Sequence, residues 1–433
     1  MTNFIFIVAD DLGYADLGCY GGRVPISPVL DRLAANGIKY VNGYSNSPVC
    51  SPTRFALMTG RYQYWVRGAS EEPMASNAKG NPDLGLYPHL PTLPSLLKEQ
   101  GYHTALIGKW HLGFRPHFGP DKSGYLHHFG PMSGGVGYYS HTGRDGKTDL
   151  ELDGEPCEEA GYLTDILSKR AAHYVRDRAA DGQPFLLSLH YTAPHWPWET
   201  RAQGRIDPEV EKNIAHLDGG NVETYQTMVK EMDEGIGWVV EALEEGGLLD
   251  DTLIIFTSDN GGERFSDNWP LVGGKMDLTE GGIRVPYIVH WPKGIRQPGS
   301  TSEQHCMTMD WTATILAIAG AQPPAEHTLD GVSMQPTFVE AGHTFERPMY
   351  WRMKHRDQRA LRLGEWKYLK VDEYEYLFNV VRDARERANQ AKREPERLAA
   401  MREQYLQWAG QVPAVPEEAR VSLVYTLADM PQR

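Results

Sequence analysis

The sequence has no run of about 18 or more apolar residues, so it offers no candidate for a transmembrane helix. It is also poor in positive charge: 43 Lys and Arg residues stand against 57 Asp and Glu residues, which gives a formal net charge of −14. Proteins that bind nucleic acids or adhere to anionic membranes need a basic surface, so we expect neither kind of partner. An anionic substrate would need cations gathered at one site against this overall charge.

Cysteine is scarce as well. The four cysteines, Cys19, Cys50, Cys157 and Cys306, lack the spacing of metal ligands and are too few to cross-link a chain of 433 residues. The first residues carry neither a basic segment nor a small-residue cleavage site, so they favour a strand over a signal peptide. If Met1 is the natural start, we expect a cytoplasmic protein, although a trimmed periplasmic or secreted form would look the same. The oligomeric state stays open.

Short apolar runs alternate with helical patterns, which is typical of an α/β protein with a largely buried sheet. The predicted strands cover residues 4–9, 104–107, 185–189, 253–257 and 285–290. The predicted helices cover residues 93–100, 163–180, 224–245 and 310–319, and a further one begins at Pro28 with Ser27 as its cap.

The composition changes near residue 335. Beyond it, residues 360–363, 366–371 and 374–378 predict an antiparallel meander, and residues 395–408 predict a charged helix. We therefore predict a large N-terminal α/β domain over residues 1–335 and a small C-terminal α+β subdomain over residues 336–433.

Two of the predicted strands end in acidic residues. The first is followed by Asp10 and Asp11, and the strand at 253–257 is followed by Asp259 and Asn260. Ligands of open α/β sheets lie beyond the carboxyl ends of the strands, and acids brought together there repel one another unless a cation lies between them. These oxygen donors suit a hard divalent ion, with Ca²⁺ favoured and Mg²⁺ as the competitor. Such residues also mark ordinary turns, and this alternative stays open here.

Cys50 begins a helical stretch in the pattern Cys-x-Pro-x-Arg, which ends at Arg54. Helix N-termini bind anions through free backbone N–H groups and lower the pKa of a thiol there. This chemistry predicts a nucleophile beneath an anionic ligand. A lone cysteine in such a setting is more often structural, so the local pattern leaves both interpretations open.

Residues 48–60, which contain this pattern, resemble the signature of the sulfatases, members of the alkaline-phosphatase-like superfamily. Residues 101–113 resemble a second signature, Gly-Tyr-x-Thr followed by Gly-Lys-x-x-x-Gly, and the Asp10-Asp11 and Asp259-Asn260 pairs fit the same order. The resemblance extends over residues 10–368. It implies a large, mixed, mostly parallel sheet between helices. It also implies a maturation enzyme that oxidises Cys50 to formylglycine (3-oxoalanine).

The resemblance assigns roles to individual residues. The metal ligands would be Asp10, Asp11, Asp259 and Asn260, together with an oxygen of the residue derived from Cys50. Arg54 would hold formylglycine oxygens or a metal ligand.

Lys109 and His111 would steady the second hydroxyl of formylglycine and the sulfate. They alternate along the chain, so both can face the site only if the backbone turns after Gly108. A buried core histidine is the ordinary alternative for His111.

For the leaving group, the resemblance favours His195, with His190 as the rival, and it adds Lys275 from a glycine-rich loop. His195 and Lys275 would neutralise charge on the departing oxygen. A lysine in such a loop is often merely exposed, so Lys275 is the weaker assignment of the two.

The implied function is that of an arylsulfatase-like sulfuric ester hydrolase, which cleaves a sulfate monoester through a formylglycine hydrate and a calcium ion and releases sulfate and an alcohol. Whether the ester is an aryl, saccharide or alkyl sulfate stays open. One alternative is a formylglycine-dependent phosphonate or phosphodiester hydrolase. Another is a non-catalytic, calcium-binding pseudo-sulfatase, if Cys50 remains a thiol.

Overall fold

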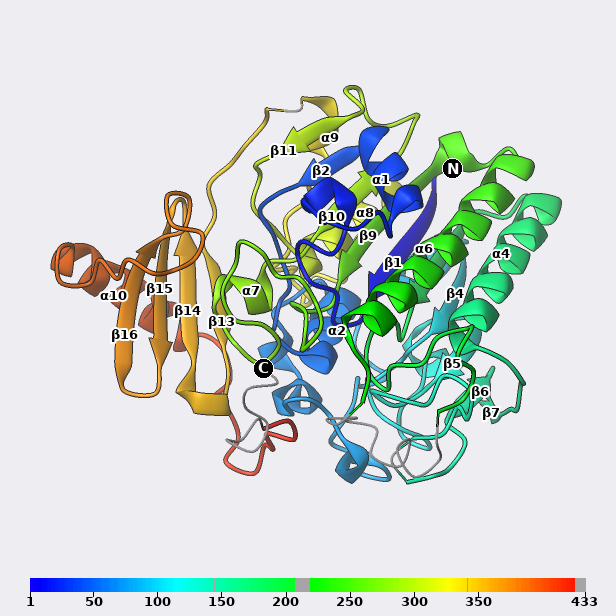
Figure 1. The fold of residues 1–433 in the computed structure, drawn as a ribbon, viewed down its shortest axis with the longest axis horizontal. Coiled ribbons are helices and arrows are strands. Elements are labelled where there is room, and N and C mark those ends of the chain that lie inside the picture. The colour runs from blue at the N-terminus through cyan, green and yellow to red at the C-terminus, as the bar shows by residue number, and fades with distance from the viewer. Residues whose placement is uncertain (144, 207–218, 341, 425–433) are drawn as a thin grey trace.

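A large sheet dominates the computed structural model of the chain, which describes residues 1–143, 145–206, 219–340 and 342–424 (Figure 1). Its strands in the described residues are β1 (Asn3–Ala9), β2 (Ile38–Tyr40), β4 (His103–Gly108), β5 (His127–Pro131), β6 (Leu150–Leu152), β7 (Glu155–Pro156), β8 (Phe185–His190), β9 (Thr252–Ser258), β10 (Tyr287–His290) and β11 (Ser300–Ser302). They lie in the order β11-β2-β10-β9-β1-β8-β4-β5-β6-β7. The central block from β9 to β5 is parallel, whereas β10, β6 and β7 run antiparallel to their neighbours.

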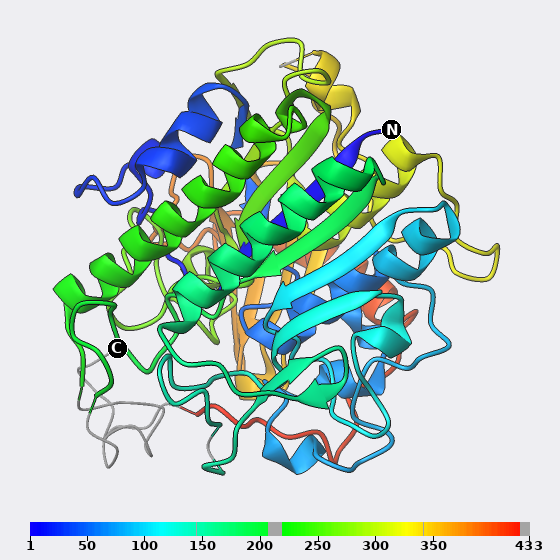
Figure 2. The ribbon, with the colours of Figure 1, turned by 90° about the vertical axis from the view of Figure 1, so that its right-hand side faces the viewer.

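Helices cover both faces of this sheet. One face carries α1 (Pro28–Ala35), α4 (Leu163–Asp181) and α6 (Val222–Glu245), and the other carries α2 (Cys50–Thr59), α3 (Leu93–Glu99) and α8 (Thr308–Ala319). Figure 2 shows α4 and α6 side by side across the first face. Side chains of a strand alternate between faces, so Ile5 and Ile7 of β1 belong to one core and Phe4 and Phe6 to the other.

A second, antiparallel sheet follows near the C-terminus. It consists of β13 (Met349–Arg352), β14 (Arg359–Leu363), β15 (Trp366–Val371) and β16 (Tyr374–Asn379), and α10 (Pro395–Ala409) packs against it. It forms the left edge of the view in Figure 1. Its apolar core continues into the large domain, where it includes Cys50 and Met276. The C-terminal sheet is therefore in contact with the segments around Cys50.

Other short elements include several 3-10 helices, a two-stranded pair, β3 (Gly43–Tyr44) with β12 (Cys306–Met307), and the helices α7 (Glu280–Ile283) and α9 (Pro336–Val339). Phe338 of α9 packs in the core of the large sheet. The division of the chain at residues 335 and 336 stays a prediction. Within the described residues, no helix is long and apolar enough to cross a membrane.

The predicted fold class is confirmed, and each predicted helix and strand lies within two residues of an observed one. The sequence analysis missed β5 and β13, of five and four residues, and the strands β2, β3, β6, β7, β11 and β12, of two or three residues. Such short runs carry little periodicity. Ser27 is the N-cap residue of α1 and Pro28 its first residue, as predicted, but the Ser27 side chain makes no capping hydrogen bond. The carboxylate of Asp233, from α6, instead accepts hydrogen bonds from the N–H groups of Val29 and Leu30, both at 2.9 Å.

Candidate active site

The ends of two neighbouring strands bring the predicted metal ligands together. β1 and β9 pair in parallel with Ala9 opposite Ser258, so the residues that follow them meet at one edge of the sheet. Asp10, Asp11, Asp259 and Asn260 are all buried there. The Asn260 amide donates a hydrogen bond to Asp11 Oδ1 at 2.7 Å, which ties one strand end to the other.

Two of the three carboxylates are paired with cations from elsewhere in the chain. Arg54, on α2, donates from Nε and Nη2 to Asp259 Oδ2 at 3.0 and 2.8 Å. Lys109 Nζ donates to Asp10 Oδ2. Burial, reinforced by the charge of Asp10, raises the pKa of Asp259 to about 6 even though Arg54 and Lys109 oppose the shift. Of the two roles predicted for Arg54, the structure therefore shows contact with a predicted metal ligand.

The third carboxylate, Asp11, is paired with the predicted lysine of the glycine-rich loop. Lys275 Nζ donates to Asp11 Oδ2 at 2.7 Å, and both side chains are buried. Burial alone would raise the pKa of Asp11, but the charge of Lys275 and the hydrogen bonds outweigh it and lower the pKa to about 2. Lys275 is thus a buried part of the cluster, contrary to the alternative of a merely exposed lysine.

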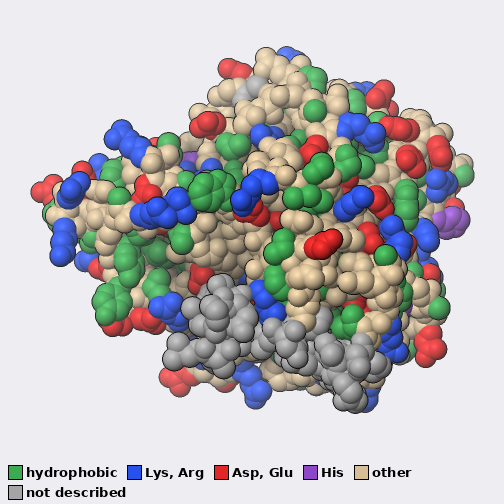
Figure 3. All heavy atoms as spheres, viewed as in Figure 1, with side chains coloured by type: hydrophobic (Ala, Val, Ile, Leu, Met, Phe, Trp, Pro, Cys, Tyr) green, Lys and Arg blue, Asp and Glu red, His purple; other side chains and the backbone are tan. Residues whose placement is uncertain are grey.

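The three cations of the cluster are nearly inaccessible to solvent, with Arg54 1% exposed, Lys109 0% and Lys275 2%. On the face of the molecule in Figure 3, by contrast, acidic and basic side chains are intermixed. Three carboxylates and three cations cancel to about zero net charge. A bound divalent cation would therefore give the site a net positive charge, which attracts an anionic ester.

The donor atoms fit a hard cation. Asp10 Oδ1 and Asn260 Oδ1 are buried and have no hydrogen-bond partner among the described residues. Leaving such an acceptor unsatisfied costs about 1–3 kcal/mol, so a ligand that accepts their lone pairs would stabilise the site. Ligand atoms of Asp10, Cys50 and Asp259 lie within 4.8 Å of one another. The carboxylates and the amide form an all-oxygen set that suits Ca²⁺ or Mg²⁺, whereas the sulfur of an unmodified Cys50 is a softer ligand.

Cys50 is the first residue of α2 and is 1% exposed. Burial raises the pKa of its thiol, although the nearby charges of Lys109 and Lys275 act in the opposite direction. The expectation that the helix N-terminus lowers this pKa is therefore wrong, because desolvation of the thiolate outweighs the favourable charges. An unmodified thiol at this position is a poor nucleophile near neutral pH.

The turn required after Gly108 is present. Gly108 has φ +119°, and a Cβ atom there would lie 1.8 Å from the carbonyl oxygen of His190, so only glycine fits. His111 also takes a left-handed conformation, with φ +57°. As a result, Lys109 reaches Asp10 and His111 lines the same cavity as Cys50.

The tautomer of His111 follows from its hydrogen bond. Nε2–H donates to the carbonyl of Met74 at 2.8 Å, while Nδ1 has no partner among the described residues. Burial, with the charge of Lys109, lowers the pKa of His111 well below its usual value. The ring is therefore neutral, and its Nδ1 lone pair is available as a proton acceptor.

The cavity distinguishes between the two histidines that were candidates for the leaving-group role. His195 lines it and His190 does not. His195 Nδ1–H donates to the carbonyl of Trp196 at 2.5 Å, and its Nε2 lies 3.6 Å from Asp11 Oδ2. Burial and the charge of Lys275 lower the pKa of His195 well below its usual value. The position of the ring favours His195 for a role toward substrate.

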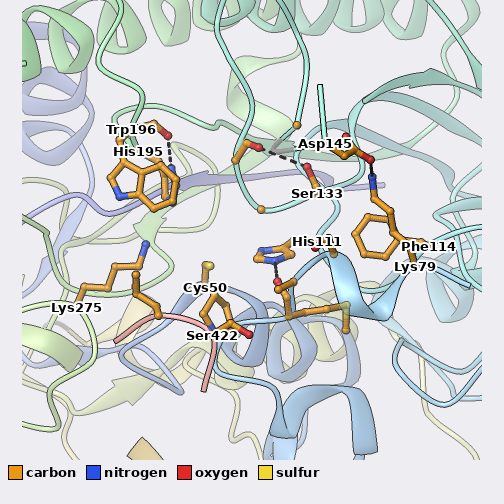
Figure 4. Close-up of a pocket in the computed structure, with 18 residues that line it drawn as sticks. Cys50, Lys79, His111, Phe114, Ser133, Asp145, His195, Trp196, Lys275 and Ser422 are labelled. Carbon is orange, nitrogen blue, oxygen red and sulfur yellow. Dashed lines mark hydrogen bonds and ion pairs between the residues drawn. The ribbon is translucent and has the colours of Figure 1, made fainter. Parts of the chain in front are cut away.

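The cavity is formed by segments far apart in the sequence, and Cys50, His111, His195 and Lys275 lie around it in Figure 4. Its lining also includes Phe114, Ser133 and Trp196, which belong to the aromatic-rich segments 110–139 and 196–198 that the sequence predicts at the rim of a pocket. The sequence analysis missed Lys79, Asp145, Ser422 and Leu423, which line the same cavity. The Lys79 ammonium donates to Asp145 Oδ2 at 2.8 Å. Charged residues in loops carry no periodic or spacing signal, so the contact between Lys79 and Asp145 could not be predicted from the sequence.

Comparison with known proteins places these features in context. The model of the Sulfatase family matches residues 2–321, and that of the N-sulphoglucosamine sulphohydrolase C-terminal region matches residues 274–404. Human N-acetylgalactosamine-6-sulfatase is 34% identical over 368 residues, which cover 81% of this chain and 68% of that protein. Human arylsulfatase A is 31% identical over 399 residues, covering 84% and 74%. The solved structure of Ps i-CgsB in complex with k-i-k-neocarrahexaose superposes with a TM-score of 0.85 at 33% identity, covering 95% and 93%.

Calcium binding tests the donor set. We expect the protein to bind Ca²⁺ in isothermal titration calorimetry and to bind Mg²⁺ less tightly, because the site offers carboxylate and amide oxygens in an irregular arrangement. Asp259→Ala should weaken Ca²⁺ binding by at least about 10- to 100-fold, since even outer-shell substitutions have effects of that size. The matched control is Asp250→Ala, an exposed aspartate before β9. Absence of Ca²⁺ binding, or equal affinity in Asp259→Ala and the wild type, would contradict the assignment.

Proposed function

Since the chain belongs to the sulfatase family, whose members are enzymes that hydrolyse sulfuric esters, we propose that it removes sulfate from a sulfated saccharide. In this proposal, residue 50 acts after conversion from cysteine to formylglycine, and calcium is the metal ion. The single observation that carries the proposal is the convergence of Cys50 with three buried carboxylates, each paired with a buried cation.

The metal would be held by Asp10, Asp11, Asp259 and Asn260 together with an oxygen of residue 50. Bound calcium supplies Lewis acidity and lowers the pKa of a hydroxyl beside it. The chain's own contribution is to hold the ligands in place: Arg54 holds Asp259 through two hydrogen bonds, and its charge opposes the rise in the Asp259 pKa that burial causes.

Formylglycine supplies, as its hydrate, two geminal hydroxyls, of which one attacks sulfur and the other later expels sulfate, so no stable ester accumulates. His111 Nδ1 can accept the proton of such a hydroxyl, because its Nε2–H is committed to Met74. Because Cys50 is 1% exposed, a maturation enzyme must reach it before α2 packs into the fold. This partner is also part of the proposal.

On the leaving-group side, the groups that would act on the departing oxygen are Nε2 of His195 and the ammonium of Lys275. His195 Nδ1–H is fixed on the Trp196 carbonyl, so the ring can protonate the departing oxygen only from Nε2 of its imidazolium form. Burial and the charge of Lys275 disfavour that form, whereas negative charge that develops on the departing oxygen would favour it. The Lys275 ammonium lies 5.8 Å from the centre of the Trp196 ring, close enough to stabilise negative charge in the same part of the cavity.

The reaction class is tested by matched substrates. The converted enzyme should hydrolyse 4-nitrophenyl sulfate with a higher kcat/KM than phenyl 4-nitrophenyl phosphonate, because the family to which the chain belongs hydrolyses sulfuric esters. Cys50→Ala should lower kcat by at least about 10³-fold, as expected for loss of a nucleophile. A higher kcat/KM on the phosphonate would favour phosphonate hydrolysis instead. Absence of turnover by converted enzyme would favour a non-catalytic binding protein.

A saccharide is favoured over a simple aryl group by the polar rim of the cavity. Lys79 and Asp145 form an ion pair there that is about one-third exposed, beside Ser133 and the ring of Phe114. Charged donors and acceptors next to an aromatic face suit the hydroxyls and the apolar face of a sugar. The names of the relatives point the same way, since N-acetylgalactosamine-6-sulfatase and the neocarrahexaose complex both concern saccharides.

The role of the rim is tested with Lys79→Met. Loss of one charged hydrogen bond should raise KM for a sulfated saccharide, beginning with N-acetylgalactosamine 6-sulfate, about tenfold. The KM for 4-nitrophenyl sulfate should change less than about threefold, because this substrate offers no hydroxyls to the rim. Lys293→Met, which removes an exposed ion pair with Asp251, is the control. Equal effects of Lys79→Met on both substrates would contradict a sugar-binding role.

A further inference from the structure

The loop that carries Lys275 is held on two sides. The N–H of Met276 donates to the carbonyl of Pro48 at 2.8 Å, just before Cys50, and Met276 has a left-handed backbone with φ +73°. A non-glycine residue in this conformation requires surrounding contacts to maintain it. The position of Lys275 relative to residue 50 is therefore set by the bonds of its neighbours in the chain.

Gln358 makes the contacts on the second side. It precedes β14 in the C-terminal subdomain and is 2% exposed. Its Nε2 donates to the carbonyl of Met276 at 2.8 Å, and its Oε1 accepts from the N–H of Leu278 at 2.8 Å. Both partners are backbone groups of fixed polarity, so the orientation of the amide is determined. One side chain thus binds the chain on either side of Asp277, immediately after Lys275.

Gln358 does not line the cavity, whereas Lys275 does. The geometry points to Gln358 as a positioning residue that holds Lys275 against Asp11, so that the C-terminal subdomain contributes to the active site through this amide. The inference rests on the proposed function only for the role of Lys275 in turnover. The anchoring of the loop is independent of it.

The anchoring is tested by hydrogen exchange in the full-length protein. Gln358→Met removes both of these hydrogen bonds, and a third from Nε2 to the carbonyl of His355 at 3.2 Å, while keeping an unbranched side chain of similar size. Gln358→Asn is a milder variant that withdraws the amide by one methylene. We expect at least about tenfold faster exchange over residues 273–283 in Gln358→Met, because the Leu278 N–H loses its acceptor. Unchanged exchange in both variants would overturn the inference.

Gln304 provides a matched control. It is also buried, and its amide likewise holds backbone groups, donating to the carbonyls of His305 and Phe345 and accepting from the N–H of Phe345 at 2.7 Å. Gln304→Met should lower the melting temperature as Gln358→Met does, yet leave kcat/KM and the exchange of residues 273–283 as in the wild type. A loss of kcat/KM in Gln304→Met equal to that in Gln358→Met would show a general structural effect and overturn the inference.

The effect on turnover is tested by a double-mutant cycle with Lys275→Ala. Gln358→Met should lower kcat/KM about 10- to 100-fold, the size expected when a catalytic group is misplaced by about 1 Å. In the Lys275→Ala background, the same substitution should change kcat/KM less than about twofold, because the group that it positions is gone. Equal losses in both backgrounds would overturn the positioning role.

Failure of the proposed function gives a different result. If Lys275→Ala keeps the wild-type kcat/KM, or if the converted wild type has no turnover, the assigned reaction fails while hydrogen exchange still decides the anchoring. If Lys275→Ala is impaired and folded Gln358→Met and Gln358→Asn are both as active as the wild type, the further inference fails alone. Where Gln358→Met does not fold, Gln358→Asn takes its place in the cycle.

Discussion

Charge compensation at the ends of β1 and β9 is the constraint on which the rest of the site depends. Two parallel strands deliver three carboxylates into a space without solvent, and each carboxylate is paired with a cation from a different segment: Arg54 from α2, Lys109 from beyond β4 and Lys275 from the loop before α7. Isolated buried charges would be too costly to maintain. The fold of the large domain thus brings these three carboxylates and three cations into contact.

The same pairing explains how an acidic protein can select an anion. The cluster is neutral by itself, so the divalent cation of our proposal would determine the sign of the local field, and the overall charge of −14 would matter less at short range. In our proposal, the residues that line the cavity beside the cluster act on two different sides of the substrate. Cys50 and His111 face the attacking side, whereas His195 and Lys275 serve the leaving group in our proposal. The neutral tautomer of His111 is fixed by a backbone carbonyl rather than by another acid.

The central sheet and the strand-end residues could be predicted because both follow from short-range patterns: buried strands are apolar runs, and polar residues at their carboxyl ends share one edge. The joint approach of Lys109 and His111 to the site required a turn that the sequence allowed through Gly108 but did not specify. The family motifs supplied His195 and Lys275. Lys79, Asp145 and Gln358 had no signal, since each acts through contacts with segments that are distant in the sequence. The pKa of Cys50 was predicted in the wrong direction, because burial cannot be inferred from a helix N-terminus alone.

The most direct test of the account is the mass of the tryptic peptide of residues 40–54 from a preparation that turns over a sulfate ester. The account predicts that residue 50 in the active molecules is an aldehyde or its hydrate, with the sulfur lost, and that the converted fraction rises in proportion to kcat across preparations. An active preparation in which residue 50 is entirely an unmodified thiol would contradict it.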